Sequence, residues 1–240
     1  MDPIDASRRS DDGETPPVPR GRTSWRLPAA SEPFVDPARR LAALRLGMGV
    51  FLASLAVLFG STALAFLVVR FSPEGARQWR GIALPWELVL STALLVASSI
   101  ACESGLRAIR AGDRGILVLR LRQCVGLALA FIVVQAWCWS GLLRGVDVIS
   151  AFRGDAEAAP LVAAWMFVVL TALHAAHVVG GLLPMMSIAR RAKEGRYTAA
   201  AHDGVLLLRN YWHFLGAIWL AIILLLVATM PAWGGGTGPT

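Results

Sequence analysis

Residues 210–233 read NYWHFLGAIWLAIILLLVATMPAW and contain no Asp, Glu, Lys or Arg. A helix made of such a run is long enough to cross the hydrocarbon core of a bilayer, which is about 30 Å thick. Four earlier apolar runs lie at residues 46–69, 86–106, 123–143 and 160–189, and of these only the second contains charged residues, Glu87 and Glu103. The sequence therefore predicts an all-α polytopic membrane protein, a bundle of five transmembrane helices.

The composition and the distribution of charge agree with this fold class. Of the 240 residues, 56% are hydrophobic and only 16% are charged, which is outside the range of soluble globular proteins. Arginine and lysine are concentrated before the first run, between the second and third, and between the fourth and fifth. Basic loops mark the cytoplasmic side, so we expect a cytoplasmic N-terminus and a C-terminus outside. The net charge of +7 reflects this bias and does not indicate nucleic-acid binding.

The two ends of the chain differ from its middle. Residues 1–38 are polar and rich in proline and arginine, and they lack the apolar core of a signal peptide. We expect them to form a disordered cytoplasmic tail, because they cannot bury enough apolar area to offset the entropy of ordering. Residues 39–233 form the predicted membrane domain, and residues 234–240 a flexible glycine-rich tail.

The fourth run places two histidines on one helix face. Thr171, His174, His177 and Gly181 are spaced by three, three and four residues, so they share a face that must point at protein. Three interpretations compete: haem ligation, a proton relay and interhelical hydrogen bonding. His213 is the remaining histidine inside an apolar run, and we estimate its depth to differ from that of His177 by roughly 12 Å. That gap disfavours a shared iron, and interhelical hydrogen bonding, within the chain or to a partner subunit, is preferred.

The other runs carry polar or small residues suited to helix contacts. Gly47 and Ser54 lie seven residues apart and predict a close helix–helix seam. In the second run, Glu103 is expected to pair with Arg107, four residues on. A proton-relay role for Glu103 is the alternative, because an acid within a membrane span is costly to keep. Gln135 is expected to face another helix.

Tryptophans and cysteines complete the set of candidate residues. Trp137 and Trp139 fit an interfacial aromatic belt, and Trp212 and Trp219 share one face of the last run. The three cysteines, Cys102, Cys124 and Cys138, lack the close spacing of a metal-binding pair and are interpreted as packing residues.

Taken together, these motifs resemble those of subunit III of the haem-copper oxidases, the cytochrome c oxidase subunit III family, in a short five-helix bacterial-type form. The likeness runs from about residue 41 to residue 233. The matching positions in the last two runs are Thr171, His174, His177-Val178, Gly181, Tyr211-Trp212-His213-Phe214 and Trp219-Leu220. Those in the first three runs are Leu46-Gly47-Met48, Phe51-Leu52-Ala53-Ser54, Ser91-Thr92, Leu94-Leu95, Ser98-Ser99, Gln135 and Trp139.

The chain departs from the family pattern at three intramembrane acids. Leu55 stands where the family usually has a buried Glu, Cys138 where it has the Glu of a Gln-x-x-Glu pattern, and Gly216 where it has an Asp. Any role of those carboxylates cannot be transferred to this chain. Longer family members have two additional N-terminal helices, and no apolar run of this sequence corresponds to them.

The resemblance implies a non-catalytic subunit of a respiratory terminal oxidase in the bacterial inner (plasma) membrane. It implies direct packing against subunit I, a place in a complex with subunit II, bound phospholipid, and support of proton uptake and active-site integrity. It implies no catalytic residue, haem or copper on this chain, the haems and copper belonging to partner subunits. The residues expected to make subunit, lipid and interhelical contacts are Ser54, Gln135, Trp139, His174, His177, Gly181, Trp212, His213 and Trp219.

Two alternatives remain at this point. The chain could serve a related quinol oxidase or nitric oxide reductase complex, which would keep the fold and change the electron donor or the partner. It could also be a stand-alone membrane transporter or cytochrome, which an absorbing haem in the isolated chain would support.

Overall fold

The structure, a computed structural model, describes residues 37–73, 84–144 and 160–229 of the chain. The regular elements in those ranges are five α-helices: α1 (Pro37–Phe71), α3 (Glu87–Arg110), α4 (Arg114–Arg144), α6 (Pro160–Lys193) and α7 (Asp203–Thr229). All five are long and apolar enough to cross a membrane. The predicted all-α fold with five transmembrane helices is confirmed. The predicted tails at residues 1–38 and 234–240 lie outside the described residues, except that residues 37 and 38 begin α1.

Several helices extend past the apolar runs at the arginine-rich ends. Helix α4 begins at Arg114 instead of residue 123, α6 ends at Lys193 instead of residue 189, and α7 begins at Asp203 instead of residue 210. Arginine, lysine and leucine are good helix formers, so the backbone hydrogen bonding continues beyond the uncharged segment. One consequence is that Arg209, expected in a loop, lies inside α7.

Glycines terminate two helices at this end of the bundle. Gly112 has φ 83°, and the N–H groups of Gly112 and Asp113 donate to the carbonyls of Ile109 and Ala108 at 3.0 and 2.9 Å. Gly195 has φ 78° and ends α6 with the same pair of bonds. This is the Schellman motif, in which the left-handed residue is usually glycine because it has no Cβ. Both turns reverse the chain sharply, so that α4 runs back along α3 and α7 along α6.

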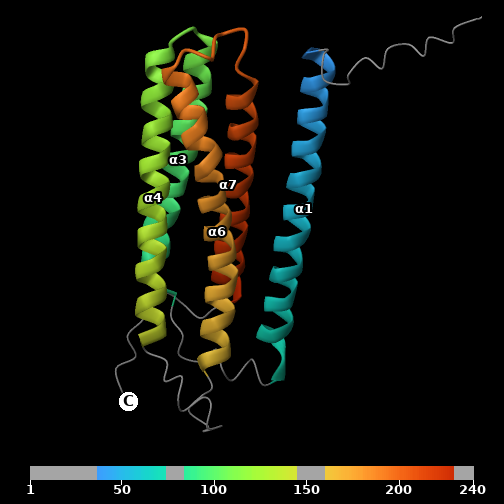
Figure 1. The fold of residues 1–240 in the computed structure, drawn as a ribbon. Helices are drawn as coiled ribbons and strands as arrows, with labels where there is room; N and C mark the ends of the chain where they lie inside the picture. Colours follow the sequence, from blue (N-terminus) through green and yellow to red (C-terminus); the bar gives the residue numbers. More distant parts are fainter. Residues whose placement is uncertain (1–36, 74–83, 145–159, 230–240) are drawn as a thin grey trace, which may run out of the picture. The chain divides into compact units, whose positions relative to one another are not determined.

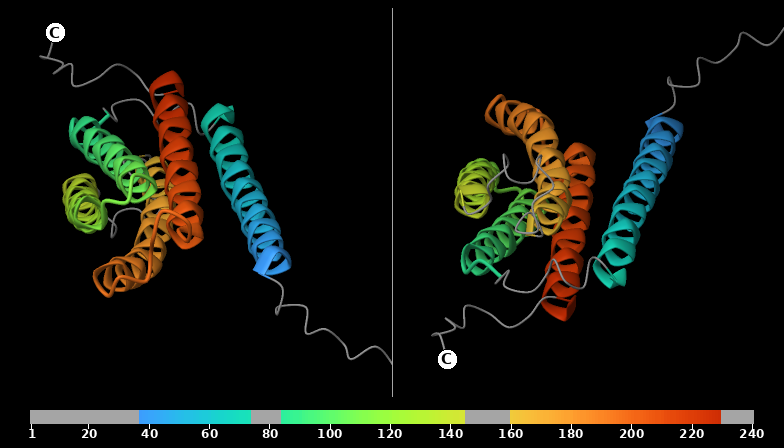
Figure 2. Two further views of the ribbon diagram at one scale, coloured as in Figure 1. Left: turned by 90° about the horizontal axis from the view of Figure 1, so that it is seen from above. Right: turned by 90° about the horizontal axis from the view of Figure 1, so that it is seen from below.

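Helices α3, α4, α6 and α7 form a bundle in which α3 packs on α4 and α7, and α6 packs on α4 and α7 (Figure 1). Helix α6 is curved (Figure 2), and Pro184 lies within it. A proline inside a helix lacks the N–H donor and clashes with the carbonyl four residues earlier, which bends the helix.

Helix α1 contacts the bundle through aromatic side chains. Phe51 stacks on Tyr211 with ring centroids 5.9 Å apart, and Phe59 lies against His177 at 5.2 Å. The Nε of Arg70 donates to the carbonyl of Thr229 at 2.8 Å, which ties the end of α1 to the end of α7.

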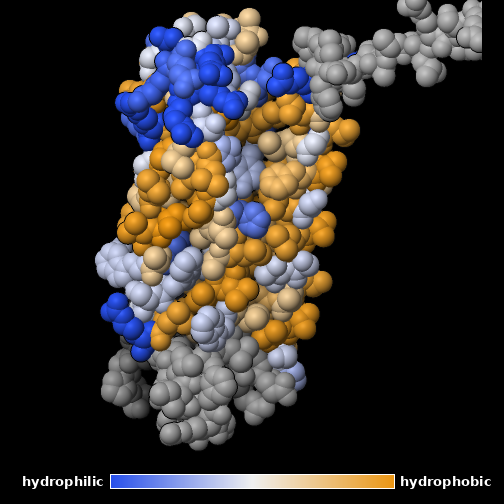
Figure 3. Space-filling view, viewed as in Figure 1, coloured by the Kyte–Doolittle hydropathy of each residue, from blue (hydrophilic) through white to orange (hydrophobic). Residues whose placement is uncertain are grey.

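The surface divides into a hydrophobic belt and a hydrophilic end (Figure 3). Hydrophilic side chains gather where α3 and α6 end and where α4 and α7 begin, and apolar side chains cover the helices below. We call this the basic end of the bundle, because α3 and α6 close there on Arg107, Arg110, Arg190, Arg191 and Lys193. This distribution is typical of a protein embedded in a bilayer.

Candidate functional site

Tryptophan side chains join the helices of the bundle through hydrogen bonds to hydroxyl groups. Trp212 and Trp219 of α7 are fully buried, and their Nε1–H groups donate to Ser98 Oγ and Thr92 Oγ1 of α3 at 2.8 and 3.0 Å. A buried indole N–H needs such an acceptor, because water is absent from the bilayer core. The predicted face of Trp212 and Trp219 is thus a contact with α3.

The same kind of bond joins α4 to α6. Trp139 Nε1 donates to Thr171 Oγ1 at 2.9 Å. The indole of Trp139 therefore points into the bundle, whereas that of Trp137 is exposed and contacts Trp86 edge to face at 6.2 Å. Of the two tryptophans expected in an interfacial belt, Trp137 has the exposed position of a belt residue and Trp139 does not.

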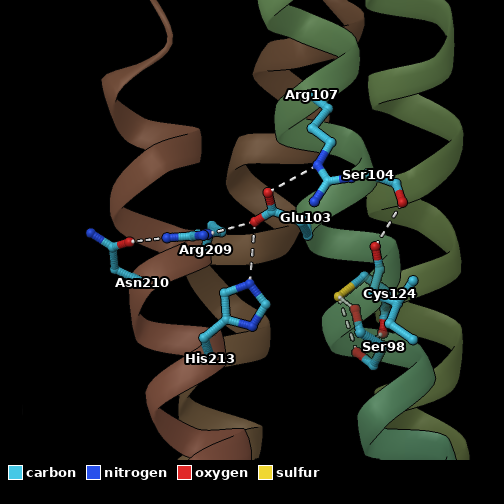
Figure 4. Close-up of polar contacts among 9 residues, drawn as sticks. Ser98, Glu103, Ser104, Arg107, Cys124, Arg209, Asn210 and His213 are labelled. Carbon is cyan, nitrogen blue, oxygen red and sulfur yellow. Dashed lines mark hydrogen bonds and ion pairs between the residues drawn. The ribbon is translucent and has the colours of Figure 1, made fainter.

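Ser98 connects three helices at one point. Besides accepting the Trp212 N–H, its hydroxyl lies 3.1 Å from Cys124 Sγ of α4, and the Cys124 thiol donates to the Ser98 carbonyl at 3.3 Å (Figure 4). Cys102, Cys124 and Cys138 are all buried free thiols, which agrees with their interpretation as packing residues. This polar contact fixes the register of α3, α4 and α7.

Gly181 permits close approach of α6 to α7. A Cβ atom built on Gly181 would lie 2.6 Å from Tyr211 Cε1 and 3.0 Å from Trp212 Cζ3. The Tyr211 hydroxyl also donates to the carbonyl of His177 at 2.8 Å. Gly181 is therefore an interhelical contact residue, and the space it leaves is filled by two aromatic rings.

Among the described residues, the imidazole rings of the two α6 histidines form no hydrogen bond to another helix of this chain. His174 is fully buried among the rings of Phe59, Phe131 and Trp219, at centroid distances of 6.1, 5.8 and 5.0 Å. Neither of its ring nitrogens has a hydrogen-bond partner among the described residues. Its role here is aromatic packing across α1, α4 and α7.

His177 satisfies one ring nitrogen within its own helix, since Nδ1 lies 2.7 Å from the Leu173 carbonyl. This ring nitrogen therefore does not reach another helix of the chain, because helix geometry always offers a carbonyl four residues back, which sequence spacing alone does not weigh against a neighbouring helix. Hydrogen bonding of these histidines to a partner subunit stays a prediction. Gln135 is buried, as predicted, but its amide atoms find no partner in the described part of the chain.

A charged cluster joins α3 to α7 near the basic end (Figure 4). Glu103 accepts hydrogen bonds from Arg107 Nε at 3.2 Å and from Arg209 Nε at 2.7 Å, and His213 Nε2 lies 3.4 Å from the same carboxylate. The predicted Glu103–Arg107 pair is confirmed. The pair is exposed at Arg107, so the shorter and more buried contact with Arg209 contributes more to helix packing.

Sequence reasoning missed the contact with Arg209. Arg209 and His213 are four residues apart, so both lie on the face of α7 that meets α3. The predicted helix began at residue 210, so Arg209 was assigned to the preceding loop and this spacing was not recognised. His213 is consequently an interhelical residue.

A groove of about 430 Å³ lies beside this cluster, between α3 and α7. Glu103, Arg107 and His213 line its polar end, and Ile100, Gly216 and Leu220 belong to its apolar part. His213, Gly216 and Leu220 of α7 thus border a groove of the size that an acyl chain or a partner side chain could fill. In the residues that the structure describes, no group of three or more His, Cys, Asp or Glu side chains could hold a metal ion.

Ser54 lies away from these contacts. Its hydroxyl donates to the Val50 carbonyl of its own helix at 3.0 Å, and its side chain is exposed. A Cβ on Gly47 would meet nothing within 4 Å. The close seam predicted for Gly47 and Ser54 is therefore not made with any described helix of this chain.

Comparison with known proteins agrees with this arrangement of motifs. Residues 38–234 match the family model described as cytochrome c oxidase subunit III. The chain belongs to the cytochrome c oxidase subunit III family.

Curated relatives cover most of this subunit III chain. The cytochrome c oxidase subunit 3 of Thermostichus vulcanus is 30% identical over 186 residues, which cover 75% of this chain and 85% of the relative. The proteins of the same name from Corynebacterium diphtheriae and Synechocystis sp. are each 26% identical to this chain. The aligned region covers 84% of the first relative, 72% of the second, and in each case 75% of this chain.

The family and the five apolar helices establish the general role. The chain is subunit III of a haem-copper oxidase, a multi-pass inner-membrane protein that works in the respiratory chain within a complex of oxidase subunits. The hydrogen bonds described above join α3 to α7 and α4 to α6.

Proposed function

We propose that this subunit III packs directly against the catalytic subunit I through the outward face of α1, with subunit II elsewhere in the same complex. The main support is the exposure of that face. In the most apolar 18-residue segment of α1, only 17% of the residues are buried within the chain, the smallest share among the five helices. A transmembrane helix that makes few contacts within its own chain has most of its surface free for lipid or for a partner.

The pattern of side chains on that face favours a partner helix. Gly47, Val50, Ser54, Val57, Ser61, Leu64 and Val68 follow one another at steps of three and four residues, and all seven are exposed. We call these seven residues the outer stripe of α1. The heptad spacing, with small residues every seven positions, is suited to left-handed packing against a second transmembrane helix.

The hydroxyls of the outer stripe do not need a partner of their own. Ser54 and Ser61 donate to the carbonyls of Val50 and Leu58 at 3.0 and 2.9 Å. Small, internally satisfied side chains allow close backbone approach without leaving a polar group unpaired in the membrane. This supports assignment of the stripe to subunit contact.

Ser54→Leu combined with Ser61→Leu should reduce co-purification of the catalytic subunit about tenfold or more, because two large side chains would fill the space needed by a partner helix. The measurement is the ratio of haem absorbance to tagged chain after purification in mild detergent. The matched control is Ala136→Leu, since Ala136 is exposed on α4. Equal haem ratios for the stripe variant and the wild type would contradict the proposal, as would equal losses in the stripe and control variants.

We further infer that the chain supports proton uptake and active-site integrity by holding the complex together, and that it does not carry protons itself. The support is the state of Glu103, whose two carboxylate oxygens are held by Arg107 and Arg209. A carboxylate fixed between two guanidinium groups is suited to joining helices and poorly suited to exchanging protons.

Glu103→Gln should therefore lower the amount of assembled oxidase while the assembled fraction keeps its oxygen consumption per haem and its ratio of protons moved to electrons. The charge is removed at nearly constant size, which leaves Arg107 and Arg209 without a counter-ion. Measurement in reconstituted vesicles checks this. A normal yield of complex with a lower proton-to-electron ratio would show that Glu103 relays protons.

Bound phospholipid is the remaining part of the proposed role. The groove beside Glu103 and the long exposed apolar faces support it, because such surfaces are covered by acyl chains in a bilayer.

A further inference from the structure

A second groove lies between the first turns of α4 and the last turns of α6, at the basic end of the bundle. It encloses about 420 Å³ and is lined by Arg122, Val125, Met186, Ala189, Arg190 and Lys193. Three of these side chains are cationic, three are apolar, and none is acidic. We call this the α4–α6 groove.

The cations of the groove are not neutralised by neighbouring acids. Among the described residues, Arg122, Arg190 and Lys193 form no ion pair, whereas Glu194, the nearest acid in sequence, is paired with Arg196 at 2.8 Å. Asp113 caps α4 by accepting the N–H of Ile116 at 2.9 Å. The groove therefore retains a positive charge of about three, although an acidic residue, Glu194, lies next to Lys193 in the sequence.

The cations and the apolar side chains are arranged along the direction of the helices. Val125 lies one turn after Arg122 in α4, and Met186 lies one turn before Arg190 in α6. In both helices the apolar residue is thus the one nearer the middle of the membrane, and the cation is nearer the basic end. A ligand that fits this order has a negative group above an apolar chain.

We propose that the α4–α6 groove binds an anionic phospholipid, with the phosphate between Arg122, Arg190 and Lys193 and an acyl chain over Val125 and Met186. Basic pockets between transmembrane helices on the cytoplasmic side are suited to anionic headgroups. An acidic protein segment would match the charges but would leave the apolar floor without a complement. The assignment rests on the proposed lipid-holding role and specifies its place and lipid class.

The test is native mass spectrometry of the delipidated oxidase complex titrated with phosphatidylglycerol and, separately, with phosphatidylcholine. Three forms are compared: wild type, the groove variant Arg122→Gln/Arg190→Gln, and the control variant Arg45→Gln/Arg110→Gln. The control removes two exposed arginines that do not line the groove. Each cation near a lipid phosphate is expected to contribute about a fivefold change in affinity.

The expected result is a first phosphatidylglycerol that binds the groove variant at least about tenfold more weakly than it binds the wild type and the control variant. Phosphatidylcholine should show no such difference. Equal phosphatidylglycerol binding by all three forms would overturn the proposal. So would loss of a protein subunit from the groove variant with unchanged lipid binding, which would identify an acidic protein partner.

This outcome is separable from the subunit role. If the wild-type chain brings down no haem-containing partner, the proposed function fails whatever the lipid titration gives. If the complex assembles normally and the groove variant binds phosphatidylglycerol like the wild type, the groove assignment alone is wrong.

Discussion

Gly181→Ala is expected to destabilise the protein, although alanine is normally the better residue inside a helix. The new methyl group would lie 2.6 Å from Tyr211 Cε1 and 3.0 Å from Trp212 Cζ3, distances that force α6 and α7 apart or displace both rings. Overpacking of this kind costs about 1–3 kcal/mol. The Tyr211–His177 hydrogen bond at 2.8 Å would be strained by the same displacement.

The neighbouring glycine provides the control. A Cβ on Gly180 would meet nothing within 4 Å, so Gly180→Ala should leave stability unchanged or raise it by about 0.5–1 kcal/mol through helix propensity. The free energy of unfolding in mixed detergent micelles is the measurement for both variants. Opposite signs at adjacent positions are expected, and destabilisation of equal size by both substitutions would show that the α6–α7 contact is placed wrongly.

Trp212→Ala should have the largest effect of any single substitution considered, about 3–5 kcal/mol of destabilisation. The side chain is fully buried, packs against the Gly181 position and donates to Ser98 Oγ at 2.8 Å. Its removal leaves a cavity where three helices meet and takes one hydrogen-bond donor away from the Ser98 hydroxyl. Trp137→Ala, at an exposed tryptophan of α4, is the matched control and should cost far less.

The hydrogen bond can be separated from the packing by a double-mutant cycle. Trp212→Phe keeps most of the ring and removes the N–H, and Ser98→Ala removes the acceptor. The expected coupling energy is about 0.6 kcal/mol and at most about 1.7 kcal/mol, the range measured for such bonds in membrane proteins. A coupling energy of zero, with both single variants destabilised, would mean that the two residues contribute independently.

The fold was predictable because the bilayer imposes simple rules on the sequence. Uncharged runs of about 20 residues require helices, and arginine clusters separate them. The same rules explain the errors in the helix ends: Arg209 and Arg122 interrupt the apolar runs, but they remain helical because charged side chains near the membrane surface need not end a helix. Gly112 and Gly195 end α3 and α6 in left-handed conformations, and the hydropathy pattern does not predict these conformations.

The contact residues were predictable as a set but not as pairs. Periodicity placed Trp212 and Trp219 on one face of the last run, yet the Trp212–Ser98 bond depends on which helices are neighbours. His174 shows the limit most clearly. Its burial was predicted because an imidazole within a membrane span must face protein. Its aromatic neighbours, Phe59, Phe131 and Trp219, lie on three other helices, which spacing within one helix cannot identify.

The most direct test of the proposed role is purification of the tagged chain from its native membrane in mild detergent, with an absorption spectrum, oxygen consumption and identification of the accompanying subunits. A non-catalytic subunit III predicts a large haem-containing subunit in the eluate and oxygen-consuming activity. The companion subunits would then show whether the donor is cytochrome c or a quinol. A colourless chain that elutes alone, under conditions that keep other respiratory complexes intact, would contradict the role.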